Sequence, residues 1–370
     1  MIRRTETDTL TGHQLTTALT LVSIGIGPYL YPLLLVKVLG RDAWLMALGN
    51  TVMVVLLAIA IGSLINNARE KDIVELYTSR IGRLVAGWAV ILVSTIAISG
   101  LVIMIRVFAD VLLLTQLLRT PRWATIGVMT ISILYIVLLG SKAVGRVSEV
   151  MFLATIPIFA LIIIARGIST DFANLLPIGE QLRSEHTRIA LLCSFCGYRG
   201  VEVLLLLAPA VGRQVNAVKA GYKAVIYAAT LVLPTVILPI VIFGPEMMSL
   251  SSFPLLDVAS TLRFPGGPVE RMVFVVIMLW HGLILASGAI QYSASANALS
   301  RLLDRISDIK SRPAVVLALA PIIWVLAQSF RNMVAVREAF ATWSSLGGTA
   351  VAITVALLWA IRWMEVRSRP

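Results

Sequence analysis

The stretch Ser23-Ile24-Gly25-Ile26-Gly27-Pro28 lies inside an apolar run, Leu15 to Val38, that is long enough to cross a membrane. The closely spaced glycines favour unwinding of a helix, and Pro28 lacks an amide hydrogen and clashes with the preceding turn. The sequence therefore predicts a helix that is broken within the membrane. Backbone groups freed at that depth must be satisfied by protein, water or a ligand, so the break is a candidate binding site. The alternative is a Gly/Pro kink that only helps helices to pack.

The composition indicates a polytopic membrane protein with a single transmembrane domain, residues 1–370. The chain is 58% hydrophobic and 14% charged, and its mean hydropathy is +0.92. The net charge is +12, but the basic residues are scattered singly, so we expect a lipid bilayer and no nucleic acid as partner. Cys193 and Cys196 form a lone C-x-x-C in an apolar run, which favours buried thiols over a metal site. We expect no metal and no cofactor.

About ten apolar runs have the length that crosses a bilayer, which predicts an all-α fold. They cover approximately residues 15–38, 43–65, 84–118, 124–139, 150–165, 189–210, 220–243, 269–299, 314–329 and 339–363. Residues 66–83 carry apolar side chains at near-helical spacing among charges, which predicts an amphipathic helix on the membrane surface. Residues 244–268 are rich in Pro and Gly and predict a long loop. Lys and Arg are more frequent on the side of the N-terminus, which places both termini in the cytoplasm.

The sixth run is interrupted as well, by Gly197-Tyr198-Arg199-Gly200, and it carries Glu202. Broken first and sixth runs predict two sets of five spans, about 13–166 and about 187–363. With five spans in each set, the second set enters the membrane from the opposite side. This pattern is typical of an inverted-topology repeat, whose two broken helices meet near the bilayer midplane to form a substrate site.

The groups freed at the breaks predict which ligand they recognise. The amides around Ile26, Gly27 and Tyr29 lie at the positive end of a helix and suit a carboxylate. Carbonyls that end the first half of each broken helix suit an ammonium group. We therefore expect a zwitterion, most simply a small amino acid. Residues on other spans that could complete the pocket are Ser94, Thr95, Ser99, Ser287, Gly288, Gln291 and Ser293. The same residue types also serve helix packing in membranes.

Charged pairs inside the spans have two interpretations. Arg199 and Glu202 stand three residues apart, and Arg106 and Asp110 stand four apart, so each pair can share a helix face. Intramembrane charges often mark function, but such pairs also lock packed helices together. His281, beside Trp280, is interpreted as a packing residue. We find no acyl-transfer triad, phosphate loop or paired carboxylates in an aqueous cleft, and so do not expect an enzyme.

Several linked motifs resemble the B subunits of GerA-type spore germinant receptors. Gly40-Arg41-Asp42-Ala43-Trp44 resembles the "G-x-D-A-W" that follows the first helix of that family. Gly200-Val201-Glu202, with Pro209 further on, resembles its "G-aromatic-E … P" in the sixth helix. The family's "F-G-x-E … Y-P … P-G-x-x-x-E-R … W" is similar to Phe243-Gly244-Pro245-Glu246, Phe253-Pro254, Pro265 to Arg271, and Trp280.

This resemblance implies the LeuT-type fold of the amino acid, polyamine and organocation transporter superfamily. It also implies nutrient sensing at the spore inner membrane beside an A subunit and a lipoprotein C subunit. The germinant site of the family carries over to Gly25, Ile26 and Gly27, to Gly200 and Glu202 near the second break, and to Ser287. The chain departs from the family pattern at Val201, where an aromatic residue is usual, and at Arg199, which adds a charge. The fifth run lacks the lysine that replaces sodium in some transporters of the superfamily.

We therefore expect a germinant-sensing subunit that binds a small amino acid and signals to partner subunits. One alternative is an amino acid transporter that works by alternating access at the same site. Another is an assembly subunit whose pocket binds nothing. Whether the space between the breaks is open, or filled by a bulky side chain such as Arg199, distinguishes the assembly subunit from the other two.

Overall fold

The computed structural model describes residues 9–67, 83–166, 170–180, 197–262, 272–307 and 311–367. The elements in these ranges are helical, apart from a single bridge between Leu10 and Val211. Most of the expected amphipathic segment 66–83, both cysteines and the first part of the sixth apolar run lie outside the described residues. Every one of the ten expected apolar runs contains helix.

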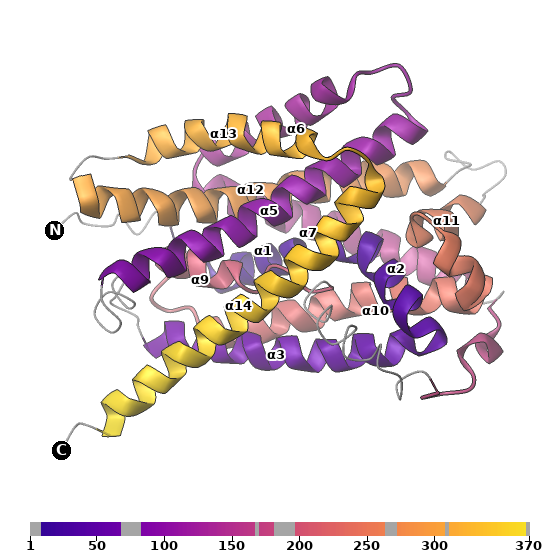
Figure 1. The fold of residues 1–370 in the computed structure, drawn as a ribbon, viewed down its shortest axis with the longest axis horizontal. Coiled ribbons are helices and arrows are strands. Elements are labelled where there is room, and N and C mark those ends of the chain that lie inside the picture. Colours follow the sequence, from indigo (N-terminus) through magenta and orange to yellow (C-terminus); the bar gives the residue numbers. More distant parts are fainter. Residues whose placement is uncertain are drawn as a thin grey trace.

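The elements follow one another in the order in which Figure 1 labels most of them. They are α1 (Gly12–Ile24), α2 (Gly27–Leu39), η2 (Gly40–Asp42), α3 (Ala43–Asn67), α5 (Arg83–Thr115), α6 (Arg122–Leu138), α7 (Ser141–Arg166), η3 (Phe172–Leu175), α9 (Val203–Leu207), η6 (Ala208–Ala210), α10 (Ala217–Leu250), α11 (Pro254–Thr261), α12 (Met272–Ser307), α13 (Arg312–Ser329) and α14 (Met333–Arg367).

The first helix starts and stops where local chemistry dictates. Thr11 caps α1 in a capping box: its hydroxyl accepts from the amide of Gln14 over 3.2 Å, and the Gln14 side chain accepts from the amide of Thr11 over 3.1 Å. The helix ends at Ile24, and α2 begins at Gly27 with Pro28 in its first turn, where a proline is tolerated. The break predicted from Gly25 to Pro28 is confirmed.

The broken first helix lies in the middle of the bundle. α1 contacts α7, α10 and α12, and every residue from Leu15 to Ile24 is buried. α12 packs against α5, and α6 pairs with α13 along one edge, while α14 crosses obliquely over α5 and α3 (Figure 1). This arrangement surrounds the first break with long helices.

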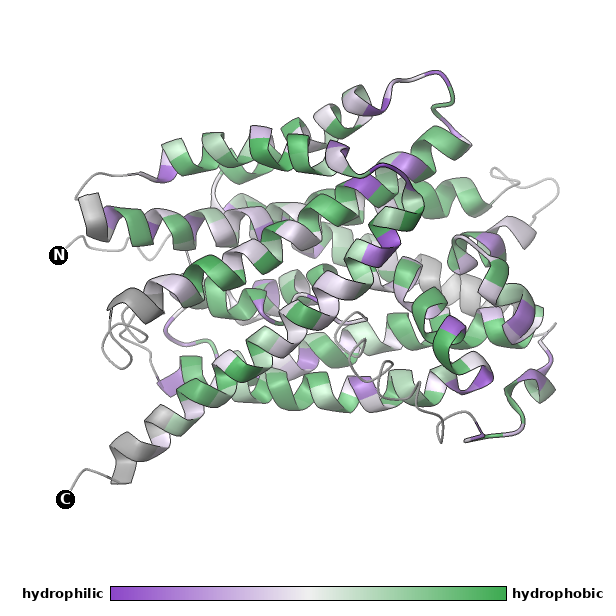
Figure 2. Cartoon of the chain, in the orientation of Figure 1, coloured by the Kyte–Doolittle hydropathy of each residue, from purple (hydrophilic) through white to green (hydrophobic). Residues whose placement is uncertain are grey.

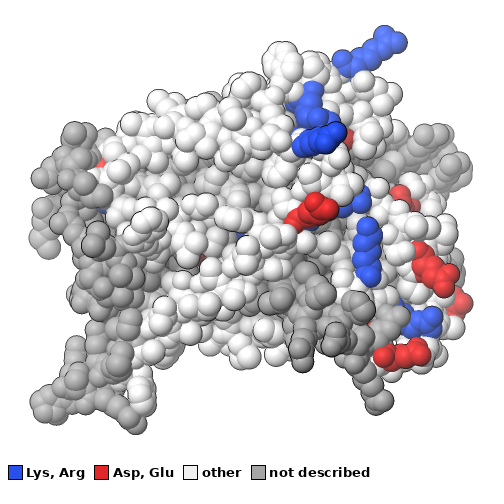
Figure 3. Space-filling model, in the orientation of Figure 1, with Lys and Arg blue, Asp and Glu red and all other residues white. Residues whose placement is uncertain are grey.

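The outer surface fits a lipid environment. Six helical stretches among the described residues are long and apolar enough to cross a membrane; α6 and α7 pass the same test only as a pair, bent by 120°. The long helices are apolar over most of their length (Figure 2). Charged side chains on the face in Figure 3 gather toward the end where α11 lies, and the middle of that face carries almost none. Trp88, Val128 and Ile131 are examples of exposed large apolar side chains.

Two predicted helix starts and one predicted loop are wrong. α7 begins at Ser141 rather than near Val150, and α14 begins at Met333 rather than near Ala339. The segment 244–268 is not one long loop, because helix resumes after Gly244 and continues to Leu250, and α11 follows. Apolar runs mark the depth of the membrane, whereas helical hydrogen bonding continues into polar residues beyond it.

The connections fall into two sets at opposite ends of the bundle. At one end, Leu10 donates to the carbonyl of Ala210, and Asn66 bonds to Asn216 over 2.9 Å. At the other end, Asp42 accepts from the amide of Gly179 over 2.9 Å. This separation agrees with the loop alternation expected from the sequence, and the cytoplasmic position of the termini stays a prediction.

Candidate functional site at the two helix breaks

The two predicted breaks touch each other through their backbones. A Cβ atom on Gly27 would overlap the carbonyl oxygen of Gly197, and a Cβ on Gly197 would overlap the ring of Tyr31. A Cβ on Gly200 would in turn overlap Val22 in the last turns of α1. Glycine at these positions therefore permits a contact between the breaks that any other residue would prevent.

The second break is confirmed as a turn over residues 197–202, after which α9 begins at Val203. Gly200 has a φ of 127°, a region that residues with a Cβ rarely adopt. Its amide donates to the carboxylate of Glu202 over 2.8 Å. The sequence brings Gly200 and Glu202 together at this break, as predicted.

At the first break a backbone amide and a backbone carbonyl come from adjacent residues. Ile26, with φ −126° and ψ −23°, accepts from the amides of Tyr29 and Leu30 and so starts α2. None of the described residues accepts a hydrogen bond from the amide of Ile26. The preceding carbonyl, that of Gly25, accepts from the indole Nε1 of Trp280 over 3.1 Å. These two groups are the opposite ends of one trans peptide. Among the described residues, its donor is unpaired and its acceptor is occupied.

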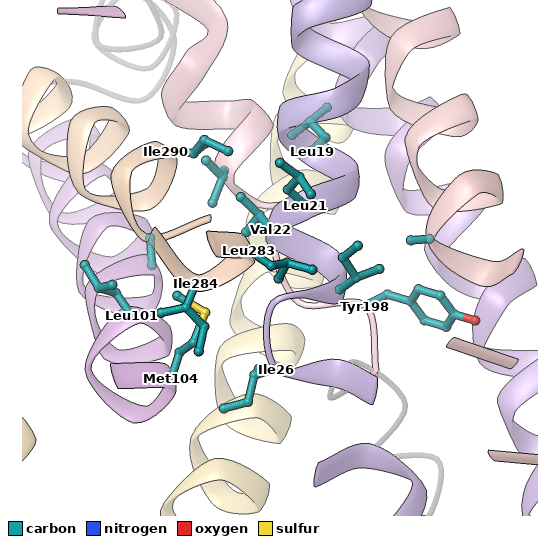
Figure 4. Packing of buried hydrophobic residues seen from close by; sticks show 14 of the residues in the cluster. Leu19, Leu21, Val22, Ile26, Leu101, Met104, Tyr198, Leu283, Ile284 and Ile290 are labelled. Atoms are coloured by element: carbon teal, nitrogen blue, oxygen red, sulfur yellow. The ribbon is translucent and has the colours of Figure 1, made fainter. Parts of the chain in front are cut away.

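Helices α5 and α12 lie against the first break. A Cβ on Gly25 would lie 2.7 Å from Oγ of Ser287 and 2.9 Å from Sδ of Met104. Ser287 is fully buried, and its Oγ accepts from the side-chain Nε2 of Gln291 over 3.3 Å. Apolar side chains close the remaining space around the break (Figure 4). The structure therefore brings Ser287 to Gly25, and its role in a ligand site stays a prediction.

Arg199 and Glu202 form the predicted ion pair, with 3.5 Å between Nη2 and Oε1, and both side chains are buried. Nη2 of Arg199 also donates to the carbonyl of Ile96 on α5 over 2.7 Å, and Nη1 donates to Oγ of Ser344 on α14 over 3.5 Å. Oγ of Ser99 donates to the same Ile96 carbonyl over 2.7 Å. Ser99 therefore adjoins the anchor of Arg199 and not the first break.

Gly288 is not brought to either break. A Cβ on Gly288 would lie 2.8 Å from Ile133 on α6 and from Leu101 on α5, so its small size lets these helices approach α12. Its place in a ligand site stays a prediction, and its structural surroundings are those of a packing residue.

The described residues pack closely around the breaks, where backbone or side-chain atoms lie within 3.0 Å of the Cβ position at each of Gly25, Gly27, Gly197 and Gly200. A cleft beside the second break has a volume of about 10 Å³, roughly that of one water, and is lined by Val54, Leu57, Tyr198, Arg199, Val201, Glu202, Gly348 and Val351. It lies on the side of α3 and α14, away from Gly25. Opening of a larger space requires the helices around the breaks to move.

Trp280 is the site residue that the sequence reasoning missed. Its indole is 1% exposed and stacks on the ring of Tyr29, with 3.3 Å between centroids and 6° between planes. One signal could have found it: tryptophan in membrane helices prefers the interface, whereas Trp280 stands in the interior of the eighth apolar run. His281, beside it, packs against Phe108 with 5.3 Å between ring centroids.

Comparison with known proteins shows the family. Residues 9–334 match a family model described as spore germination protein. The chain belongs to the spore germination protein family. The resemblance read from the motifs is thereby confirmed at the level of the family. Among curated proteins, spore germination protein YndE of Bacillus subtilis (strain 168) is 22% identical to this spore germination protein over 302 residues, which are 79% of this chain and 78% of YndE.

The fold of this spore germination protein is also found in a solved transporter. The crystal structure of MhsT in complex with L-phenylalanine superposes with a TM-score of 0.66 at 14% sequence identity, and the match covers 92% of this chain and 88% of MhsT. This likeness confirms the predicted all-α, LeuT-type fold. The family and the apolar helices together establish an integral membrane protein with a nutrient-related permease or receptor role.

Proposed function

We propose that this spore germination protein senses a germinant: it binds a small amino acid between the two helix breaks and passes a conformational change to partner subunits. The observation that carries the proposal is the peptide group between Gly25 and Ile26, at the point where the two breaks touch: its amide has no acceptor among the described residues, and its carbonyl accepts only from the indole of Trp280 among them. The partners that we propose are the A and C subunits of a GerA-type receptor. The proposed setting is the spore inner membrane, with both termini in the cytoplasm.

The two groups have the chemistry of an amino acid site. The amide of Ile26 stands at the start of α2, where the positive end of the helix favours a carboxylate. The carbonyl of Gly25 can accept from an ammonium group. The Ile26 amide and the Gly25 carbonyl belong to one trans peptide and point in opposite directions, so one ligand molecule does not bond to both. A zwitterion can place its ammonium group at the Gly25 carbonyl and its carboxylate at another amide in the first turn of α2. MhsT, which shares the fold, was crystallised with an amino acid, and this supports the same ligand class here.

A packed site fits a receptor that works through two conformations. The ligand can enter only if the breaks separate, so its binding must favour an open arrangement over the packed one. Arg199 connects the second break to α5 and α14, and separation of the two breaks would therefore displace both helices. Such a change at the centre of the bundle is what partner subunits would detect.

The close packing around the breaks also favours a second candidate, an assembly subunit that binds no ligand. A transporter remains the other alternative, because alternating access at the same breaks would need the same ligand contacts. Transport of the ligand across the membrane distinguishes a transporter from a receptor, and binding of the ligand distinguishes both from an assembly subunit.

The test is equilibrium binding of radiolabelled amino acids to the purified protein in lipid nanodiscs, followed by uptake into proteoliposomes. We expect saturable binding of a small amino acid, loss of at least about tenfold in affinity for its deaminated and its decarboxylated analogues, and no uptake above empty liposomes. A tenfold loss corresponds to about 1.4 kcal/mol. Saturable uptake would replace the receptor by a transporter. Absence of binding across all amino acids would leave the assembly subunit as the function.

A further inference from the structure

The indole of Trp280 occupies the acceptor at the first break. Its Nε1 donates to the carbonyl of Gly25 over 3.1 Å, and the ring is almost fully buried. This carbonyl is one of those that α1 leaves without an intrahelical partner where it ends. A side chain from α12 therefore satisfies the backbone group that the break exposes, 255 residues away in sequence.

Aromatic rings hold the indole in this position from three directions. Tyr29 of α2 stacks on its face, and Phe108 of α5 meets it edge-on at 5.1 Å and 75°. Phe253, just before α11, also meets it edge-on at 6.5 Å and 65°. Edge-to-face and stacked pairs each add to the stability of such a cluster. The indole is therefore a fixed part of the closed break and not a loosely packed side chain.

An ammonium group and this indole need the same acceptor. Each is a hydrogen-bond donor, and the carbonyl of Gly25 can accept from either of them. Ser287 and Met104 also crowd Gly25, so the described residues leave the break closely packed while the indole is in place. Binding of an amino acid at the break thus requires that Trp280 first withdraw from the carbonyl.

We propose that Trp280 is a built-in competitor of the ligand, whose indole N–H takes the place that the ligand's ammonium group takes on binding. This inference rests on the proposed amino acid site and adds a specificity-determining residue to it. A ligand without a hydrogen-bond donor at this position cannot replace the bond that the indole gives up. The competition also sets a minimum affinity for the ligand, because the ligand must displace a donor that is always present.

The variant Trp280→Phe tests this competition, since it keeps an aromatic ring and removes the N–H donor. We expect the amino acid that binds the wild-type protein to bind Trp280→Phe about tenfold more tightly, because the closed state loses a buried hydrogen bond. The matched control is Trp324→Phe. The indole of Trp324 also donates to a backbone carbonyl over 3.1 Å, that of Trp123, but on α13 and away from the breaks. This control should bind as the wild type does.

A second variant keeps the test decisive if Trp280→Phe does not fold, as judged by its thermal melt in nanodiscs. Phe108→Leu removes a ring that positions the indole and leaves its N–H in place, and we expect a two- to threefold gain in affinity. Unchanged or weaker binding in the folded variants, with binding retained by the wild type, would overturn the competitor and leave the amino acid site standing. No binding by any of these proteins would overturn both.

Discussion

The guanidinium group of Arg199, inside the second helix break, donates to the backbone carbonyl of Ile96 in the middle of α5 over 2.7 Å. This carbonyl belongs to an intact helix, and Oγ of Ser99 bonds to it as well. A charged side chain on the broken segment is thereby anchored to a continuous helix, with Glu202 as its counter-charge. The relationship explains how an unwound segment keeps one position at the centre of a membrane protein.

Removal of this cation should be costly unless its partner is removed too. Arg199→Met leaves the buried carboxylate of Glu202 unpaired, and we expect the protein to lose about 3 kcal/mol of stability. The double variant Arg199→Met, Glu202→Met should recover more than half of this loss, because it buries no charge. Thermal melts of the three proteins in nanodiscs measure the difference. Equal destabilisation in the single and double variants would show that the ion pair does not hold the segment.

The positive φ of Gly200 predicts a contrast between two glycine substitutions. Gly140 also has a positive φ, 95°, but a Cβ there meets nothing within 4 Å. Gly140→Ala should therefore cost only the backbone strain, about 1 kcal/mol. Gly200→Ala adds an overlap with Val22 and should lower the melting temperature distinctly more. Equal effects of the two substitutions would mean that the breaks are not in contact.

The second buried charge cluster predicts an unequal effect of two arginines. Arg106 pairs with Asp110 over 2.9 Å and donates to the carbonyl of Phe330 beyond the end of α13 over 2.7 Å. Arg122 pairs with the same Asp110 over 3.1 Å but is 45% exposed. We expect Arg106→Met to cost about 3 kcal/mol and Arg122→Met less than about 1 kcal/mol. Chemical unfolding in detergent, followed by circular dichroism, would contradict this if Arg122→Met were the more damaging change.

The surroundings of Gly288 predict a stability effect without a binding effect. A Cβ there would lie 2.8 Å from two side-chain ends, so Gly288→Ala should cost about 1 to 3 kcal/mol of packing strain. The affinity for the amino acid should not change, because the residue does not reach the breaks. A lower affinity in a variant with an unchanged melting temperature would show that Gly288 belongs to the ligand site.

Local chemistry made much of the fold predictable. The break was predicted from Gly25, Gly27 and Pro28, and it falls among them: Ile26 departs from helical φ and ψ, and α2 begins at Gly27 with Pro28 in its first turn. Gly200 adopts a positive φ within the interruption of the sixth run. The spans follow from apolar length alone. The boundaries near Ser141 and Met333 did not follow, because a helix that extends beyond the membrane shows no change in apolar content where it begins.

The contents of the site were less predictable, because they depend on packing between distant segments. Ser287 was expected as a hydroxyl that lines the ligand pocket; the structure brings it to Gly25, and its role toward a ligand stays a prediction. Trp280 was missed as a site residue, and Tyr29 was named for its amide but not for its ring, because no local pattern says that an indole will reach the carbonyl of Gly25. The closed packing around Gly25 was equally invisible in the sequence.

The central claim is that the ligand binds at the first break, and the most direct measurement compares amino acid affinity in Gly25→Ala and Gly49→Ala. A Cβ at Gly25 lies 2.7 Å from Oγ of Ser287, whereas one at Gly49 on α3 meets nothing within 4 Å. We predict that Gly25→Ala weakens binding at least about tenfold, or about 1.4 kcal/mol, because the added methyl group would stand beside the carbonyl that the ligand's ammonium group approaches in the open state, and this loss exceeds the strain that it adds to the packed state. Gly49→Ala should bind as the wild type does. Wild-type affinity in a folded Gly25→Ala protein would contradict the account.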